Sequence, residues 1–378
     1  MKRICILLVL FLTILLTGSA LGESESFLVI SDIHFTEDAQ ENHSAAREAV
    51  IRAARGKDAV LLLGDNTSNS RSGEHTLFRQ WVQELSQRTE AAIWLIPGNH
   101  DYTSSFGPED YTVLYRIYGW DKAFSRDPSS ASYAVMTEKG TCLLMLDTNQ
   151  FQQGRLPLSY GGIPGDMLIW IQTVLETLPD GTPVLACGHH PILPPERDEL
   201  TPGANALAAI LRAYGVNLYL CGHEHGFATT EKDGLRQITI GQPQSYPGLA
   251  GLMMQEQGVF FWQTEPLYDE DSPDFIAMRE KSRSLGREIA KGTLAGTPYD
   301  GDEEAVEWFV SAFMLFADGD MAPNLSARLL ADKNCEKWRL VETRTVVKDW
   351  ILGLLENPPE DVRNIPLPQS RKHALTLP

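Results

Sequence analysis

The chain has 378 residues, of which 43% are hydrophobic and 22% charged, a globular composition that excludes global disorder. This length allows one large domain, or a large domain with an appendage. The formal net charge of -18 makes the surface repel polyphosphate backbones, so nucleic acid is not expected as a partner. A small phosphate ester is not excluded, because bound metal ions reverse the local field.

The N-terminus has the pattern of a secretory signal peptide. Lys2 and Arg3 form a short basic region, and the apolar stretch 4–17 is too short to span a bilayer comfortably. Small residues at Ala20 and Gly22 fit signal-peptidase cleavage before the next residue. We therefore expect residues 1–22 to be removed and the mature protein to be secreted or held at the cell surface, with no stable membrane span. The alternative is an uncleaved membrane anchor.

Five apolar runs of strand length follow in the next 200 residues. They are Phe27 to Ile30, Ala59 to Leu63, Ala92 to Ile96, Pro183 to Cys187 and Leu218 to Cys221. Helical patterns lie between and after them, at about 42–56, 72–88, 109–118, 165–178 and 203–214. This alternation of strand and helix is typical of βα units in a parallel or mixed sheet.

This alternation of strand and helix changes in two places. The runs 132–136 and 142–146 flank a Lys-Gly turn and predict a hairpin. Three further runs predict consecutive short strands at 235–240, 249–254 and 258–262. We therefore expect a second sheet packed against the first.

A different organisation is predicted beyond residue 268. The acidic stretch 269–273 reads as a linker, and helical patterns follow at about 274–291, 302–316, 323–332 and 336–356. The Pro-rich end predicts an irregular tail. The predicted division is a signal peptide at 1–22, a main domain at 23–268 and a helical extension with tail at 269–378. Whether these helices cap a site or only support the sheets stays open.

Each of the five strands ends in a cluster of polar, ligand-type residues. The clusters are Asp32-Ile33-His34, Gly64-Asp65-Asn66, Gly98-Asn99-His100-Asp101, Gly188-His189-His190-Pro191 and Gly222-His223-Glu224-His225. One such cluster alone is weak evidence, since Asp and His also serve in ordinary turns. Five at one topological position indicate a site at the carboxyl edge of a sheet. Imidazole, carboxylate and carboxamide ligands suit borderline metals, and there are too many here for one ion. On chemistry alone either His189 or His190 could be a ligand.

This ordered set, within residues 27–265, resembles the calcineurin-like metallophosphoesterase superfamily. The resemblance implies an α/β fold, a four-layer α/β/β/α sandwich of two mixed sheets with a dinuclear metal centre at the sheet edge. It makes Asp65 the carboxylate that bridges the two ions. One ion would be completed by Asp32, His34 and His225, and the other by Asn99, His189 and His223. His189, not His190, takes the ligand position before the proline, which leaves His190 as a wall residue.

The resemblance also implies the chemistry. His100 matches a catalytic histidine that is not a ligand, and Asp101 matches its orienting partner. The expected function is an exported hydrolase of phosphate esters that uses two Zn, Mn or Fe ions and a hydroxide shared between them. Diester and monoester substrates stay open, and a non-catalytic scaffold on the same fold is the competing class. Ser68 stands where the purple acid phosphatases place a metal-binding tyrosine, so that branch is not expected.

Other polar and sulfur residues have simpler expected roles. Cys142, Cys187 and Cys221 lie in or at the ends of apolar strands and are expected as small core residues. His43 and His75 are expected to be solvated. Asp147 follows an apolar run and is expected to close a turn by hydrogen bonding.

Overall fold

The protein is described by a computed structural model that covers eight stretches of the chain. They are residues 24–38, 44–151, 157–193, 201–318, 323–342, 347–356, 364–365 and 367. The predicted signal peptide and His43 lie outside these stretches. Among the described helices, none combines the length and the apolar character needed to cross a membrane.

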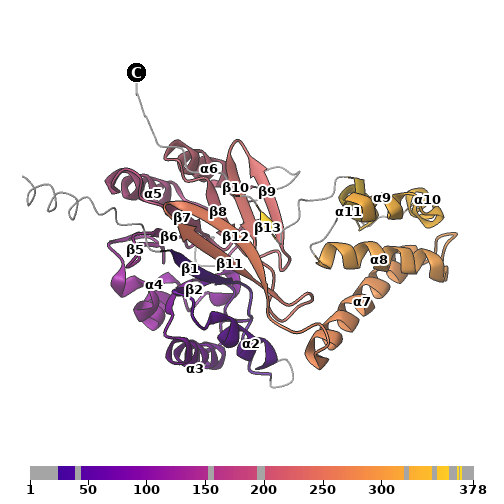
Figure 1. Cartoon of the computed structure of the whole chain (residues 1–378), viewed down its shortest axis with the longest axis horizontal. Helices are drawn as coiled ribbons and strands as arrows, with labels where there is room; N and C mark the ends of the chain where they lie inside the picture. Colours follow the sequence, from indigo (N-terminus) through magenta and orange to yellow (C-terminus); the bar gives the residue numbers. More distant parts are fainter. Residues whose placement is uncertain are drawn as a thin grey trace, which may run out of the picture.

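Two mixed sheets form the centre of the molecule (Figure 1). The first has the order β13-β12-β11-β1-β2-β3, and the second β4-β5-β6-β7-β8-β10-β9. The strands of the first are β1 (Glu25–Ile30), β2 (Ala59–Leu63), β3 (Ala92–Ile96), β11 (Leu249–Glu256), β12 (Val259–Pro266) and β13 (Asn364–Ile365). Those of the second are β4 (Ser125–Arg126), β5 (Tyr133–Met136), β6 (Cys142–Met145), β7 (Val184–Cys187), β8 (Leu218–Cys221), β9 (Ala228–Lys232) and β10 (Leu235–Thr239). The parallel strands β1-β2-β3 form one end of the first sheet, and the parallel strands β6-β7-β8-β10 lie at the centre of the second.

Helices cover the outer face of each sheet. The helices on the first sheet are α2 (Ser44–Ala54), α3 (Ser72–Thr89) and α4 (Pro108–Tyr115), and those on the second are α5 (Gly165–Thr177) and α6 (Ala204–Ala213). Alternation along β1 shows the layering, because successive side chains point to opposite faces. Phe27 and Val29 belong to the core between the sheets, whereas Leu28 and Ile30 pack under the helices. The predicted α/β/β/α sandwich is confirmed.

Two details differ from the sequence predictions. Only β10 of the three late strands joins the second sheet, while β11 and β12 return to the first, where β11 pairs antiparallel with β1. Met253 and Trp262 then fill the core between the sheets. The expected irregular tail is also wrong in part, because β13 pairs with β12 at the sheet edge. The hairpin of β5 and β6 is confirmed.

The C-terminal helices have a core of their own. They are α7 (Pro273–Leu294), α8 (Glu303–Asp318), α9 (Pro323–Leu330), α10 (Lys333–Leu340) and α11 (Val347–Glu356), and they lie to one side of the sandwich (Figure 1). Trp308, Phe309 and Trp338 stack at the centre of this core. The single helix expected at 336–356 is wrong. Val341 ends α10 with an extended backbone and a buried side chain.

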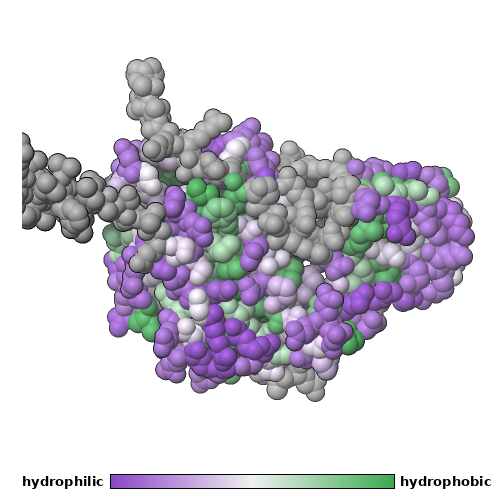
Figure 2. Space-filling model, viewed as in Figure 1, coloured by the Kyte–Doolittle hydropathy of each residue, from purple (hydrophilic) through white to green (hydrophobic). Residues whose placement is uncertain are grey.

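The surface and the cysteines agree with the composition. Figure 2 shows hydrophilic residues over much of the visible face, as the strong negative charge requires. Cys142, Cys187 and Cys221 are buried and unpaired, which confirms the expected core role.

Candidate metal centre

Backbone strain is concentrated at the predicted ligands. Nine described residues other than glycine have a positive φ, and five of these are predicted ligands. The five are Asp32 (56°), His34 (47°), Asp65 (49°), His223 (74°) and His225 (58°). Left-handed backbone is costly for residues with a Cβ and persists where the surrounding structure requires it, commonly at functional sites.

Glycines let the loops approach each other around these residues. Gly64 has φ +92°, and a Cβ there would lie 2.7 Å from both the Gly98 nitrogen and His189 Nδ1. A Cβ at Gly98 would collide with the Asp65 carboxylate. Larger residues would therefore separate the strand ends from which the site is built.

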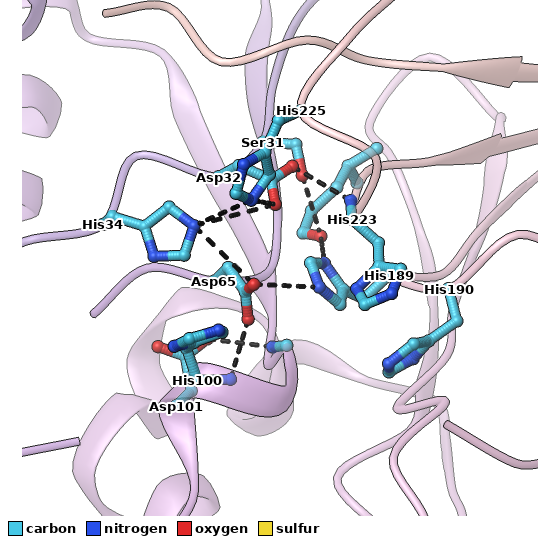
Figure 3. Close-up of polar contacts among 12 residues, drawn as sticks. Ser31, Asp32, His34, Asp65, His100, Asp101, His189, His190, His223 and His225 are labelled. Atoms are coloured by element: carbon cyan, nitrogen blue, oxygen red, sulfur yellow. Dashed lines mark hydrogen bonds and ion pairs between the residues drawn. The ribbon is translucent and has the colours of Figure 1, made fainter. Parts of the chain in front are cut away.

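The first ligand group consists of Asp32, His34, Asp65 and His225 (Figure 3). The Nε2 atoms of His34 and His225 lie 3.2 Å apart, and His225 Nε2 lies 3.4 Å from Asp32 Oδ1. His34 Nε2 lies 3.7 Å from Asp65 Oδ2. Atoms bound to one tetrahedral ion at about 2.0–2.2 Å are separated by roughly 3.3–3.6 Å, so these spacings fit a shared cation.

The second group uses the same Asp65 oxygen. His189 Nε2 lies 3.3 Å from Asp65 Oδ2, and one ring nitrogen of each of His189, His190 and His223 lies within 4.8 Å of the others. Asn99 stands next to His100, whose backbone N–H donates to Asp65 Oδ1 at 2.8 Å. Asp65 is thus a carboxylate whose Oδ2 reaches histidines of both groups.

Unpartnered buried acceptors support the fit to metal ions. Asp32 Oδ1 and Asn99 Oδ1 are buried and have no hydrogen-bond partner. Buried polar atoms without partners are rare and expensive, so these two oxygens call for a donor or a cation. The two groups would hold two ions that share Asp65.

The local electrostatics favour cations over protons at most of these residues. Burial lowers the pKa of His34 and of His223 to about 4, so both rings are neutral and keep lone pairs at pH 7. Burial opposes ionisation of Asp65, but His189 and His34 outweigh it and hold the pKa of that carboxyl well below its usual range. Burial also acts against a charged His189, yet Asp65 raises its pKa to about 9.

One hydrogen bond determines which nitrogen of His189 is available to a metal. His189 Nδ1 lies 2.8 Å from the Leu63 carbonyl oxygen, which can only accept. Nδ1 therefore keeps its proton, and Nε2, which faces Asp65, is the nitrogen that can give up its proton to a metal.

His100 lies beside the first group without belonging to it. Its ring is exposed and meets the His34 ring edge-on, with centroids 5.0 Å apart. His100 Nδ1 donates to the Ser68 carbonyl oxygen at 2.7 Å, which fixes the ring and leaves Nε2 free.

The expected contact between Asp101 and the His100 ring is wrong. Asp101 is fully buried, and its oxygens accept from the backbone N–H groups of Thr67 at 2.8 Å, Gly98 at 2.9 Å and Asn66 at 3.1 Å. These bonds join the loop after β2 to the loop after β3. Asp101 therefore positions His100 only through the backbone, while the Ser68 carbonyl orients the ring.

Comparison with known proteins agrees with this geometry. The pattern that defines the calcineurin-like phosphoesterases matches residues 26–227. This chain belongs to the calcineurin-like phosphoesterase family. Membership confirms the resemblance drawn from the five motifs and supports phosphoester hydrolysis as the reaction class.

Individual members of the calcineurin-like phosphoesterases show the extent of the likeness. A probable glycerophosphodiester phosphodiesterase, GpdQ, of Arcobacter nitrofigilis is 29% identical over 192 residues, 49% of this chain and 63% of that protein. A probable cyclic nucleotide phosphodiesterase of Synechococcus is 30% identical over 273 residues, 66% of this chain and 95% of that protein. A solved dimetal phosphatase of Danio rerio is 15% identical with a TM-score of 0.49, over 65% of this chain and 97% of that one. The chain thus spans less than two thirds of the Arcobacter protein's length.

Two expectations about neighbouring residues now have answers. His75 is buried, not solvated, and its ring nitrogens pair with Ser70 Oγ at 2.9 Å and Tyr115 Oη at 2.7 Å. Ser70 Oγ also donates to the Asp101 carbonyl at 2.8 Å, so His75 supports the loop below the site. Asp147 closes its turn as expected, accepting from the Asn149 backbone N–H at 3.1 Å.

Sequence reasoning missed Asn66 as a supporting residue. Asn66 Nδ2 donates to Asp101 Oδ2 at 2.9 Å and to the Ile96 carbonyl at 3.0 Å. Its place directly after Asp65 was the available signal.

The sharing of Asp65 predicts a loss of both ions on one substitution. Asp65→Asn should lower metal content at both positions, because the amide cannot supply a second anionic oxygen. His223→Ala should weaken chiefly one position, by about 10–100-fold or more. Elemental analysis after equilibration with Zn²⁺ or Mn²⁺ measures both. Asp147→Asn is the control, a buried carboxylate outside both groups that should keep both ions. Full metal occupancy in Asp65→Asn would refute the shared ligand.

The contacts of Asp101 predict a loss of stability as well as of activity. Asp101→Asn would turn an NH₂ group toward buried backbone N–H donors, which should cost about 2–5 kcal/mol of unfolding free energy. Urea unfolding measures this. If stability is unchanged while turnover is lost, Asp101 acts on His100 directly and the structural role assigned here is wrong.

Proposed function

We propose that this calcineurin-like phosphoesterase hydrolyses small phosphate esters with the help of two metal ions. The observation that carries the proposal is the shared Asp65 oxygen, 3.7 Å from His34 Nε2 and 3.3 Å from His189 Nε2. Two cations held a few ångströms apart supply a hydroxide nucleophile at neutral pH and neutralise phosphoryl charge. Zn, Mn and Fe all suit this mixture of imidazole and carboxylate ligands.

His100 is the group assigned to the leaving oxygen. Its Nδ1 is used by the Ser68 carbonyl, so a proton for the leaving group can travel only through Nε2. The ring is exposed at the edge of the first ligand group, where a substrate can reach it. Protonated His100 would donate from Nε2 as the ester bond breaks.

The substrate proposed is a small diester or monoester, and not a nucleic acid. The net charge of -18 disfavours long polyanions. Two relatives bear the names of phosphodiesterases, which places diesters first in any test. Ser68 Oγ donates to the His34 carbonyl at 3.0 Å, so a hydroxyl bonded to backbone stands in place of a metal-binding phenolate.

Export is part of the same proposal. The basic, apolar and small-residue regions within residues 1–22 support cleavage before Glu23 and a secreted or cell-surface enzyme. N-terminal sequencing of the mature protein would decide between this and a retained anchor.

A substrate panel tests the reaction. Metal-analysed protein should hydrolyse bis-nitrophenyl phosphate, glycerophosphodiesters or nitrophenyl phosphate, and a chelator should abolish turnover. Adding back Zn²⁺ or Mn²⁺ should restore it. Protein that holds two ions and turns over none of these mono- and diesters would overturn the proposal and favour a binding role.

Substitution of His100 tests proton donation separately from metal binding. His100→Asn should keep both ions, and turnover should fall by about 10²–10⁴-fold, the usual contribution of a positioned acid. The loss should be smaller for a nitrophenyl ester than for an alkyl ester, because nitrophenolate leaves without protonation. Parallel assays of the two esters measure this difference. Equal losses on both esters would assign His100 to the phosphoryl oxygens, and no loss would remove it from the reaction.

A further inference from the structure

His190 is a buried histidine with one unused nitrogen. It follows the ligand His189, its side chain is fully buried, and its Nε2 has no hydrogen-bond partner. The backbone of Ser159 acts on the ring as a hydrogen-bonding neighbour, although Nε2 has no partner within full hydrogen-bond geometry. A buried ring nitrogen without a partner at the edge of a metal centre requires an explanation.

Thr148 determines the protonation of the His190 ring. The Thr148 hydroxyl oxygen accepts from the backbone N–H of His190 at 3.0 Å and of His189 at 3.3 Å. These two bonds use the acceptor capacity of the oxygen, so its own proton must go to His190 Nδ1, 2.8 Å away. Neutral His190 therefore has its lone pair on Nδ1 and its proton on Nε2.

The two adjacent histidines thus have opposite tautomers. The Leu63 carbonyl takes the Nδ1 proton of His189 and leaves its Nε2 as a lone pair, which a metal can bind. The Thr148 hydroxyl does the reverse to His190 and leaves an N–H donor at Nε2. A donor cannot ligate a cation through the same atom without losing its proton, so His190 is suited to an anion.

The position of His190 indicates which anion. Its ring centroid lies 4.7 Å from that of His223 and 4.9 Å from that of His189, two ligands of the second ion group. Gly161, with φ +67°, closes the opposite side, where a Cβ would lie 2.5 Å from His190 Nδ1. The ring is thereby held between Gly161 and the rings of His189 and His223, next to the place where the second cation would bind a phosphoryl group.

We propose that His190 binds substrate, donating a hydrogen bond from Nε2 to a phosphoryl oxygen that the metal ions also contact. The inference rests on the proposed function, because it takes a phosphate group as the anion. Hydrogen bonds to charged oxygens are stronger than neutral ones, and a buried donor that needs no reorganisation adds to transition-state stabilisation.

Two variants of the same residue separate the donor from the rest of the ring. In His190→Gln the side-chain amide reaches the position of Nε2 and keeps a donor there. In His190→Asn the amide reaches only the position of Nδ1 and keeps the contact with Thr148. His190→Asn should weaken binding of inorganic phosphate to the metal-loaded protein by about 10–100-fold, as expected for a hydrogen bond to a charged group. His190→Gln should recover most of that affinity.

Metal content and tautomer are the readouts that exclude other roles. Both His190 variants should hold the same amount of metal as the wild type, whereas His189→Asn should lose metal. ¹⁵N-histidine NMR of the Zn²⁺-loaded wild type should show a protonated Nε2 and an unprotonated Nδ1 for His190, and this measurement needs no variant to fold.

Several outcomes would overturn the proposal. Metal loss in His190→Asn as large as in His189→Asn would make His190 a ligand. Unchanged phosphate affinity in both His190 variants would mean that the Nε2 proton meets only buried water. Failure of the metal-loaded wild type to bind phosphate also refutes it. If phosphate binds as expected but no ester is hydrolysed, only the proposed function fails.

Discussion

The centre depends on one histidine ring that joins the two sheets. His189 follows β7 of the second sheet, yet Nδ1 donates to the Leu63 carbonyl at the end of β2 and Nε2 meets Asp65. The apolar core between the sheets brings these edges together but does not fix their relative position, because burial has no direction. The polar contacts of the His189 ring fix that relative position. A larger residue at Gly64 would block that approach, since its Cβ would lie 2.7 Å from the ring.

Neighbouring oxygens decide what each histidine of the site can do. A carbonyl can only accept, so the Ser68 and Leu63 carbonyls place a proton on Nδ1 of His100 and His189. The Thr148 hydroxyl can donate, and it places the proton of His190 on Nε2. Chemically identical histidine side chains are thereby suited to three different proposed roles: metal ligand for His189, acid for His100 and hydrogen-bond donor for His190. The division lies in residues that bind neither metal nor substrate, and mutating such residues commonly costs metal affinity or activity.

Local patterns predicted the strands, the order of the layers and the residues that meet at the site. Apolar runs that end in Asp, His and Asn can be recognised in the sequence. Their polar side chains are expected to meet, because the carboxyl ends of parallel strands lie at one edge of the sheet. Contacts between segments that are distant in the chain could not be predicted from the sequence. Asp101 was expected to face His100 and instead binds the backbone of Asn66 and Thr67, and His75 was expected in solvent and lies against Tyr115. The pairing of β13 was missed for the same reason, since its partner lies about 100 residues earlier.

The C-terminal helices are connected to the candidate metal centre through the loop after β10. This connection bears on whether the helices cap the site or support the structure around it. Gln244 Nε2 donates to the Asp32 carbonyl at 2.8 Å, beneath a ligand whose φ is 56°. Two residues later, Tyr246 packs against the helical core and its hydroxyl bonds to Asp318 at the end of α8. The strained backbone of Asp32 is therefore fastened to a loop that the helices hold. A strained conformation persists only when its surroundings impose it. These contacts make the helical extension a support for the first ligand group.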